Sequence, residues 1–122
     1  MCKQFTPEDN DRRAFLLMVI NGVLDRDVRL LQHALSTRCQ VCAPGYRVHL
    51  ETPVANHLEV TIWDRDDGDF EEMCKLAIQM YQMLNDLNDK RYEDDESEGF
   101  DDIDVRVLQR RQLPAALIAA RE

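Results

Sequence analysis

Two short stretches near the middle of the chain alternate between apolar and polar residues, and they constrain the fold more than any other feature. The apolar members are Tyr46, Val48 and Leu50 in the first stretch and Leu58, Val60 and Ile62 in the second. Alternation with a period of two predicts strands that bury one face, and the five-residue connection 52–56 suits an antiparallel hairpin. Trp63 falls on the polar face, where it either forms a partner surface or covers the end of the strand.

Apolar residues at helical spacing precede and follow this hairpin. Thr6 and Pro7 are typical of a helix start, and the apolar pattern then continues over 15–35. The Asn21-Gly22 pair interrupts it, so we expect either one long bent helix or two helices at about 7–21 and 25–37. A further stripe predicts a helix over 70–87, formed by Phe70, Met73, Cys74, Ala77, Met80, Tyr81, Leu84 and Leu87.

A third short strand and a final helical turn complete the predicted elements. Ile103, Val105 and Val107 alternate with polar residues, and Pro114 can open a helical turn over 115–120. The predicted order is therefore α(α)ββαβα, and 122 residues fit a single domain over 1–122. The expected class is α+β, with a small antiparallel or mixed three-stranded sheet and helices packed on one face.

The acidic charge of the chain is concentrated in one stretch. Residues 64–104 hold sixteen acidic residues against four basic ones, a net charge of −12. The whole chain carries −9, because 1–63 is neutral and 105–122 carries +3. Such a segregated field attracts cationic surfaces and repels phosphates, so we expect no direct binding of nucleic acid and a protein partner with a basic surface.

This charge pattern predicts a non-enzymatic acidic protein-binding module, with 93–102 as an acidic loop that is mobile in isolation. Its sharpest form is a phage-type inhibitor that mimics nucleic acid and blocks a basic restriction, CRISPR or repair complex. The expected contact residues are Asp64, Asp66, Asp67, Asp69, Glu93, Asp94, Asp95, Glu96, Glu98, Asp101 and Asp102.

Two alternatives belong to other functional classes. In size, charge and mixed composition the chain is similar to the small acidic chaperones of type III secretion effectors, which would imply a dimeric adaptor. A homodimer is compatible with either kind of binder.

The second alternative is a small metal-dependent or phosphoryl-transfer enzyme that uses Asp64 and Asp66. Asp64 and Asp66 follow an apolar strand in a D-x-D pattern that resembles the first motif of haloacid dehalogenase-type phosphoryl-transfer enzymes. The resemblance implies Asp64 as nucleophile and Asp66 as acid/base, although the Gly-Thr that usually follows is absent. We expect no enzyme, and we assign no catalytic residue, cofactor or metal ligand from the sequence.

Cysteine use and the lack of long apolar runs predict a cytoplasmic protein without a membrane segment. Cys39 and Cys42 form a C-x-x-C pair, which is compatible with zinc, with redox chemistry or with ordinary reduced thiols. The turn-forming Pro44-Gly45 follows at once, and this favours ordinary thiols. No signal peptide pattern precedes the first helix, and the longest apolar run, 14–20, is too short to span a bilayer.

Overall fold

The computed structural model describes residues 10–42, 45–64, 70–89 and 99–113. The elements follow the predicted order, and the helical turn expected over 115–120 lies outside the described residues. They are α1 (Asn10–Leu24), α2 (Val28–Cys42), β1 (Tyr46–Val54), β2 (His57–Asp64), α3 (Phe70–Asp89), β3 (Asp102–Val107) and the short 3-10 helix η2 (Arg110–Gln112).

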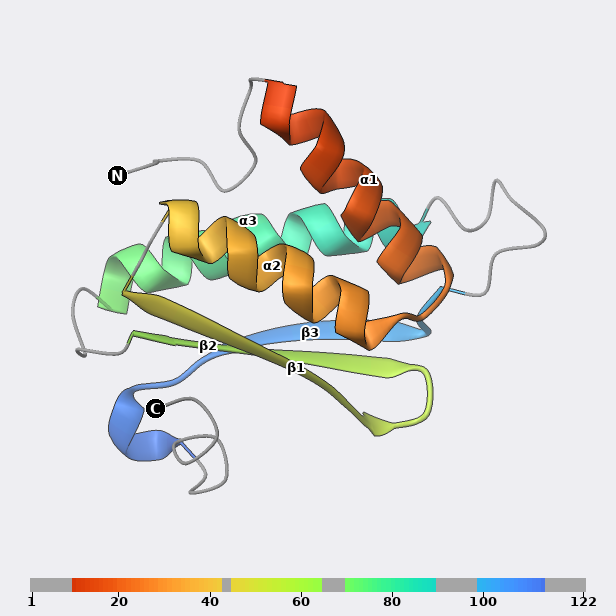
Figure 1. Ribbon diagram of the computed structural model, residues 1–122. Helices are drawn as coiled ribbons and strands as arrows, with labels where there is room; N and C mark the ends of the chain where they lie inside the picture. The colour runs from red at the N-terminus through yellow and green to blue at the C-terminus, as the bar shows by residue number, and fades with distance from the viewer. Residues whose placement is uncertain (1–9, 43–44, 65–69, 90–98, 114–122) are drawn as a thin grey trace.

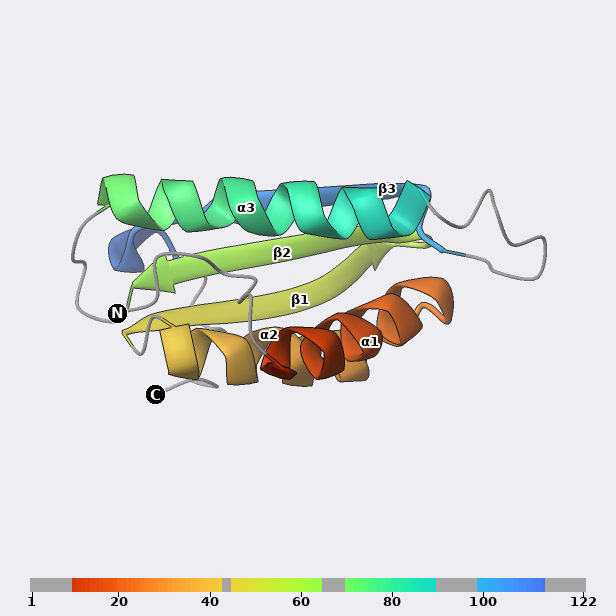
Figure 2. The same ribbon diagram turned by 90° about the horizontal axis from the view of Figure 1, so that it is seen from above.

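The sheet has three strands in the order β1-β2-β3, with β2 in the centre. β1 is antiparallel to β2, as a hairpin requires, while β3 is parallel to β2 because α3 carries the chain back along the sheet. All three long helices lie on one face of the sheet (Figure 1). Viewed from above, α3 runs beside β3 and α2 beside β1 (Figure 2). The predicted α+β class, with a mixed sheet and helices on one face, is confirmed.

The core lies between the sheet and the helices, where the predicted apolar face of the hairpin is buried. Val48, Leu50, Leu58, Val60 and Ile62 are at most 4% exposed. From α3, the inner part of the predicted stripe packs against them, namely Met73, Ala77, Met80, Leu84 and Leu87. Burying an aliphatic side chain of this size contributes about 1.5–3 kcal/mol, so this layer supplies most of the apolar stabilisation.

The first helical region forms two helices, but the break lies after the position that the sequence indicated. Asp27 N–H donates to Gly22 O at 2.8 Å and Arg26 N–H donates to Val23 O at 3.3 Å, a Schellman-type end for α1. Arg26 takes the left-handed conformation, with φ 52°, that glycine usually supplies there. Asp27 then caps α2, because its Oδ1 accepts the N–H of Leu30 at 3.1 Å.

Gly22 therefore serves packing between helices and does not break α1. A Cβ at this position would lie 2.7 Å from Leu31 Cγ and 2.8 Å from Leu31 Cδ2. Since Leu31 is fully buried, it has little room to move away. The glycine allows α1 and α2 to approach closely at their shared end.

We predict that Gly22→Ala destabilises the protein by about 1–3 kcal/mol, because overpacking against Leu31 outweighs the gain in helix propensity of about 1 kcal/mol. Urea unfolding followed by circular dichroism measures the change. The control is Asn21→Ala at the exposed neighbouring position, which should keep or raise the midpoint. An unchanged midpoint for Gly22→Ala would contradict the close approach.

The outer edge of β1 is closed by a side chain from α2. The Gln32 amide donates from Nε2 to Val48 O at 2.7 Å, and its Oε1 accepts the N–H of Leu50 at 2.8 Å. The same Nε2 lies 2.9 Å from Ser36 Oγ, which fixes the amide on its own helix. Edge strands with free N–H and C=O groups can pair with other chains, so Gln32 both fastens α2 to the sheet and blocks part of this edge.

We expect Gln32→Met to lower the free energy of unfolding by about 1–3 kcal/mol, since it leaves two half-buried backbone groups without their partner. Differential scanning calorimetry measures this loss. Gln40→Met, at an exposed position of the same helix, should stay within about 0.5 kcal/mol of the wild type. Equal stability of the two variants would show that the amide bonds contribute nothing.

Candidate functional site

Three chain turns meet at one end of the molecule and are joined at Asn56. The guanidinium of Arg26, between α1 and α2, donates from Nη1 to Asn56 Oδ1. Asn56 O accepts the N–H of Asp101 at 2.8 Å and that of Asp102 at 3.4 Å. Asn56 also has φ 66°, a conformation that asparagine tolerates better than most residues. The α1–α2 turn, the hairpin turn and the start of β3 therefore form one connected surface.

The chain that leads into β3 is anchored at the same end. Phe100 is 1% exposed, and the buried Asn88 side chain binds its backbone twice. Asn88 Nδ2 donates to Phe100 O, and Asn88 Oδ1 accepts the Phe100 N–H, both at 2.8 Å. Within the stretch expected as an acidic loop over 93–102, the buried Phe100 ring and the Asn88 amide hold the chain just before β3. Residues 93–98 lie outside the described residues.

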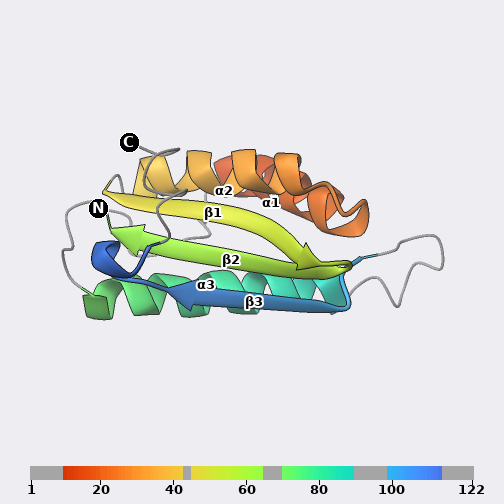
Figure 3. The same cartoon turned by 90° about the horizontal axis from the view of Figure 1, so that it is seen from below.

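Exposed carboxylates surround this junction. We name them the acidic end; they are Asp25, Asp27, Asp86, Asp89, Asp101 and Asp102. They come from the α1–α2 turn, the last turns of α3 and the start of β3, which lie at the same end of the molecule in Figures 1 and 3. Asp101 and Asp102 were predicted as contact residues, and both are exposed here.

Figure 3 shows the sheet face opposite the helices. The strand register and the burial pattern place a further set of carboxylates on this face. The strand register places Glu51 opposite Glu59 and Glu59 opposite Asp104, so one acidic residue from each strand lies in a row across the sheet. We call these three residues the carboxylate row. Like charges directly opposite each other destabilise a sheet, so this arrangement requires compensation.

Each member of the carboxylate row is met by a nitrogen from a neighbouring row. His49 Nε2 lies 3.9 Å from Glu51 Oε2, and Arg106 Nη2 lies 2.9 Å from Glu59 Oε1. Arg106 also donates from Nε to Thr61 Oγ1 at 2.8 Å, which fixes its guanidinium. The charged Arg106 offsets the repulsion at Glu59, the central member of the row.

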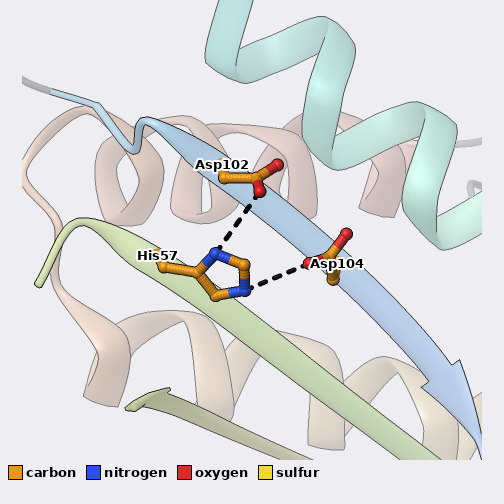
Figure 4. A group of neighbouring side chains, drawn as sticks. All are labelled: His57, Asp102 and Asp104. Atoms are coloured by element: carbon orange, nitrogen blue, oxygen red, sulfur yellow. Dashed lines mark ion pairs between the residues drawn. The ribbon is translucent and has the colours of Figure 1, made fainter. Parts of the chain in front are cut away.

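The third nitrogen belongs to His57, whose imidazole lies between two carboxylates of β3 (Figure 4). Nε2 is 3.1 Å from Asp104 Oδ2 and Nδ1 is 3.4 Å from Asp102 Oδ2. The His57 side chain is 27% exposed, against 63% and 58% for the two aspartates. Within the described residues, this is the group of histidine, cysteine and acidic side chains whose geometry fits a metal ion.

The sequence placed His57 on the polar strand face, but it gave no reason to pair it with Asp102 and Asp104. The cluster depends on β3 lying parallel to β2 in a register that puts Asp102 opposite His57. The alternation over 102–106 carried part of the signal, since it places both aspartates on one face. Neither the strand neighbour nor the register can be derived from that alternation alone.

The two groups of predicted contact residues do not come together in the described part of the chain. Asp64 ends β2 and is only 7% exposed, whereas Asp102 pairs with His57 at the start of that strand. Eight residues of extended chain separate the two ends by roughly 23 Å. Asp66, Asp67, Asp69, Glu93, Asp94, Asp95, Glu96 and Glu98 lie outside the described residues.

Trp63 covers the strand end and does not form an exposed surface. It lies on the sheet face opposite the three long helices but is 2% exposed, because Leu108 and Leu113 pack against it. η2 lies on this face at the same end (Figure 3). Of the two interpretations of this tryptophan, burial is the one that the structure supports.

The C-x-x-C pair and Cys74 both lie on helices. Cys39 is buried and is not part of a disulfide, and Cys42 is the last residue of α2, so the C-x-x-C pair ends a helix and does not begin one. Reactive C-x-x-C pairs use a helix start to lower the thiol pKa, so this position lacks that feature. Cys74, on α3, is a half-buried free thiol.

In comparisons with protein-family models, with curated proteins and with solved structures, no match to this chain was found. Among the described residues, no helix combines the length and the apolar character needed to cross a membrane.

The pairing of Arg106 with Glu59 predicts a measurable coupling. Arg106→Gln should destabilise the protein by about 1 kcal/mol, because Glu59 then faces two carboxylates without its cation. In the background of Glu59→Gln the same change should cost less than half as much, a coupling of about 0.5–1 kcal/mol in a double-mutant cycle. Arg111→Gln, at an exposed position of η2, is the control. Additive effects of the two changes would contradict the compensation.

Proposed function

We propose that this protein is a non-enzymatic binding module whose acidic end docks on a basic surface of another protein. The observation that supports this is the convergence of exposed carboxylates from three separate segments on one rigid junction at Asn56. The only arginines in the α1–α2 turn and the first turn of α2 are Arg26 and Arg29, and the Arg26 guanidinium contacts Asn56. Six exposed carboxylates against these two arginines leave the acidic end with a negative charge, which would steer association with cationic surfaces.

The finer form of the proposal is an inhibitor that mimics nucleic acid. Carboxylates on a fixed framework occupy a lysine- and arginine-lined groove in place of phosphates, and they exclude the nucleic acid by competition. A protein that neutralises restriction, CRISPR or repair complexes works in the cytoplasm of the cell that contains them, which agrees with the location expected from the sequence. The partner is then a nucleic-acid-binding protein.

Two double variants, one at the acidic end and one at the start of α3, test whether the acidic end is the docking surface. Asp25→Asn with Asp101→Asn removes two charges at the junction, and neither side chain has a described hydrogen bond to lose. Glu71→Gln with Glu72→Gln removes two charges at the start of α3, about 30 Å away along the helix. Partners are captured from nuclease-treated lysate, eluted with salt and identified by mass spectrometry. We predict that the first variant binds the captured basic protein about three- to tenfold more weakly, while the second changes affinity less than twofold.

The proposal also requires that duplex DNA or RNA competes for the captured partner, and that affinity falls as salt rises. Neutralising Glu93, Asp94, Asp95 and Glu96 together tests the acidic tract in the same assay. If neither set of changes weakens binding, the acidic end is not the contact surface.

A second candidate function is the dimeric chaperone or adaptor. It is favoured by apolar side chains that remain exposed on α3, where Phe70, Ile78 and Tyr81 are 42%, 56% and 45% exposed. At about 3.6 residues per turn these three positions share one side of the helix. A groove of about 240 Å³ between α1 and α2, lined by Phe15, Met18 and Val41 among others, adds apolar surface. A partner whose binding persists at high salt would favour the chaperone or adaptor function over docking through the acidic end.

A further inference from the structure

Both ring nitrogens of His57 face carboxylates of β3, an arrangement in which a cation could bind between the imidazole and its neighbours. A neutral imidazole has one N–H donor and one acceptor nitrogen. Here both ring nitrogens face carboxylate oxygens, at 3.1 and 3.4 Å. In the neutral ring, one of these contacts would set a nitrogen lone pair against an ionised oxygen. A cation bound at one of the two contacts would remove this mismatch.

The two contacts differ in length, and the difference indicates which ring nitrogen could bind a metal and which could donate a proton. In tetrahedral zinc sites the ligand atoms lie about 2.0–2.1 Å from the metal, so neighbouring ligand atoms are about 3.3 Å apart. The distance between His57 Nδ1 and Asp102 Oδ2, 3.4 Å, is close to that separation. The distance of 3.1 Å between Nε2 and Asp104 Oδ2 lies in the range over which a ring N–H can donate to a carboxylate. One nitrogen suits a metal and the other suits a donated proton.

We propose that His57 Nδ1 and Asp102 bind a divalent transition-metal cation of the zinc class, with Asp104 as the positioning residue. Asp104 accepts the Nε2–H, which fixes the tautomer and leaves the Nδ1 lone pair directed at the metal, as in carboxylate–histidine–metal arrangements. Imidazole nitrogen with carboxylate oxygen is a ligand set that Zn²⁺ accepts, and water completes the coordination.

The position of the cluster favours reversible binding. Asp102 and Asp104 are more than half exposed and lie on the sheet face opposite the helices, so a hydrated ion can reach them. Arg106, the arginine on the same strand, contacts Glu59 and Thr61. A proton on Nδ1 competes with the metal, so the metal should bind more weakly as the pH falls.

The inference stands apart from the proposed function, since it needs no protein partner, and its test uses the metal alone. Zn²⁺ is titrated into the reduced full chain while the ring nitrogens of the three histidines are followed by ¹H–¹⁵N NMR. Because the spectrum resolves individual rings, thiol binding elsewhere in the chain does not obscure the result. We expect the Nδ1 signal of His57 to move on zinc addition while its Nε2 remains protonated, and His33 to stay unchanged.

Single substitutions at the three residues of the cluster test which of them bind the metal. His57→Gln and Asp102→Asn should each weaken zinc binding at this site about 100-fold or abolish it, and Asp104→Asn should weaken it about 10-fold. Asp101→Asn, which removes the same charge from the adjacent exposed residue, should change affinity less than twofold. Circular dichroism confirms the fold of each variant.

Three results would overturn the proposal. The first is a His57 ring whose nitrogen signals do not change when zinc is added. The second is metallation at Nε2, which reverses the roles of Asp102 and Asp104. The third is equal loss of zinc affinity in Asp101→Asn and Asp102→Asn, which indicates only a diffuse attraction to the acidic surface.

Discussion

The pairing of the central strand β2 on both of its edges is the constraint on which the rest of the structure depends. Its antiparallel pairing with β1 and its parallel pairing with β3 set every cross-strand neighbour at once. Side chains in a sheet alternate between faces, so a shift of one residue in either register would exchange the buried and exposed faces of that strand. The register that buries Ile103 next to Leu58 therefore also exposes Asp102 and Asp104 on the face that carries His57. Core stability and the position of the charged site are fixed by one set of hydrogen bonds.

Local patterns were enough to predict the class and order of the elements, because helices and strands here follow their own periodicity. The alternation around Val48 and Val60 and the stripe around Met80 identified many core residues, although Phe70 and Tyr81 of that stripe are exposed. Features that depend on distant partners could not be predicted. The Asn21-Gly22 pair is typical of a helix break. Only the short distance between Gly22 and Leu31 in the structure shows that this glycine serves close packing. Phe100 sits in an acidic stretch that suggests a loop, and its burial depends on Asn88.

The candidate site was predictable in its charge but not in its arrangement. Counting acidic residues over 64–104 treats them as one surface, whereas β2 separates Asp64 from Asp102 and buries the former. Conversely, Asp25 lies in the neutral part of the sequence but belongs to the acidic end, because the α1–α2 turn meets the hairpin through Arg26 and Asn56. Acidic residues that are close in the sequence form one acidic surface only where the fold keeps them on the same side of the molecule.

The acidic end and the His57 cluster share Asp102, and this joins the two proposals physically. A cation held by Asp102 neutralises part of the field that attracts a basic partner, and a docked lysine or arginine would in turn compete with that cation. Two ligands that bind one site exclusively lower each other's apparent affinity by the same thermodynamic linkage. The size of the effect depends on how much of the docking energy comes from Asp102 and how much from Asp25 and Asp101, which lie away from the imidazole. Docking that relies on the latter two would tolerate the metal, so the balance between these carboxylates determines whether metal and partner compete.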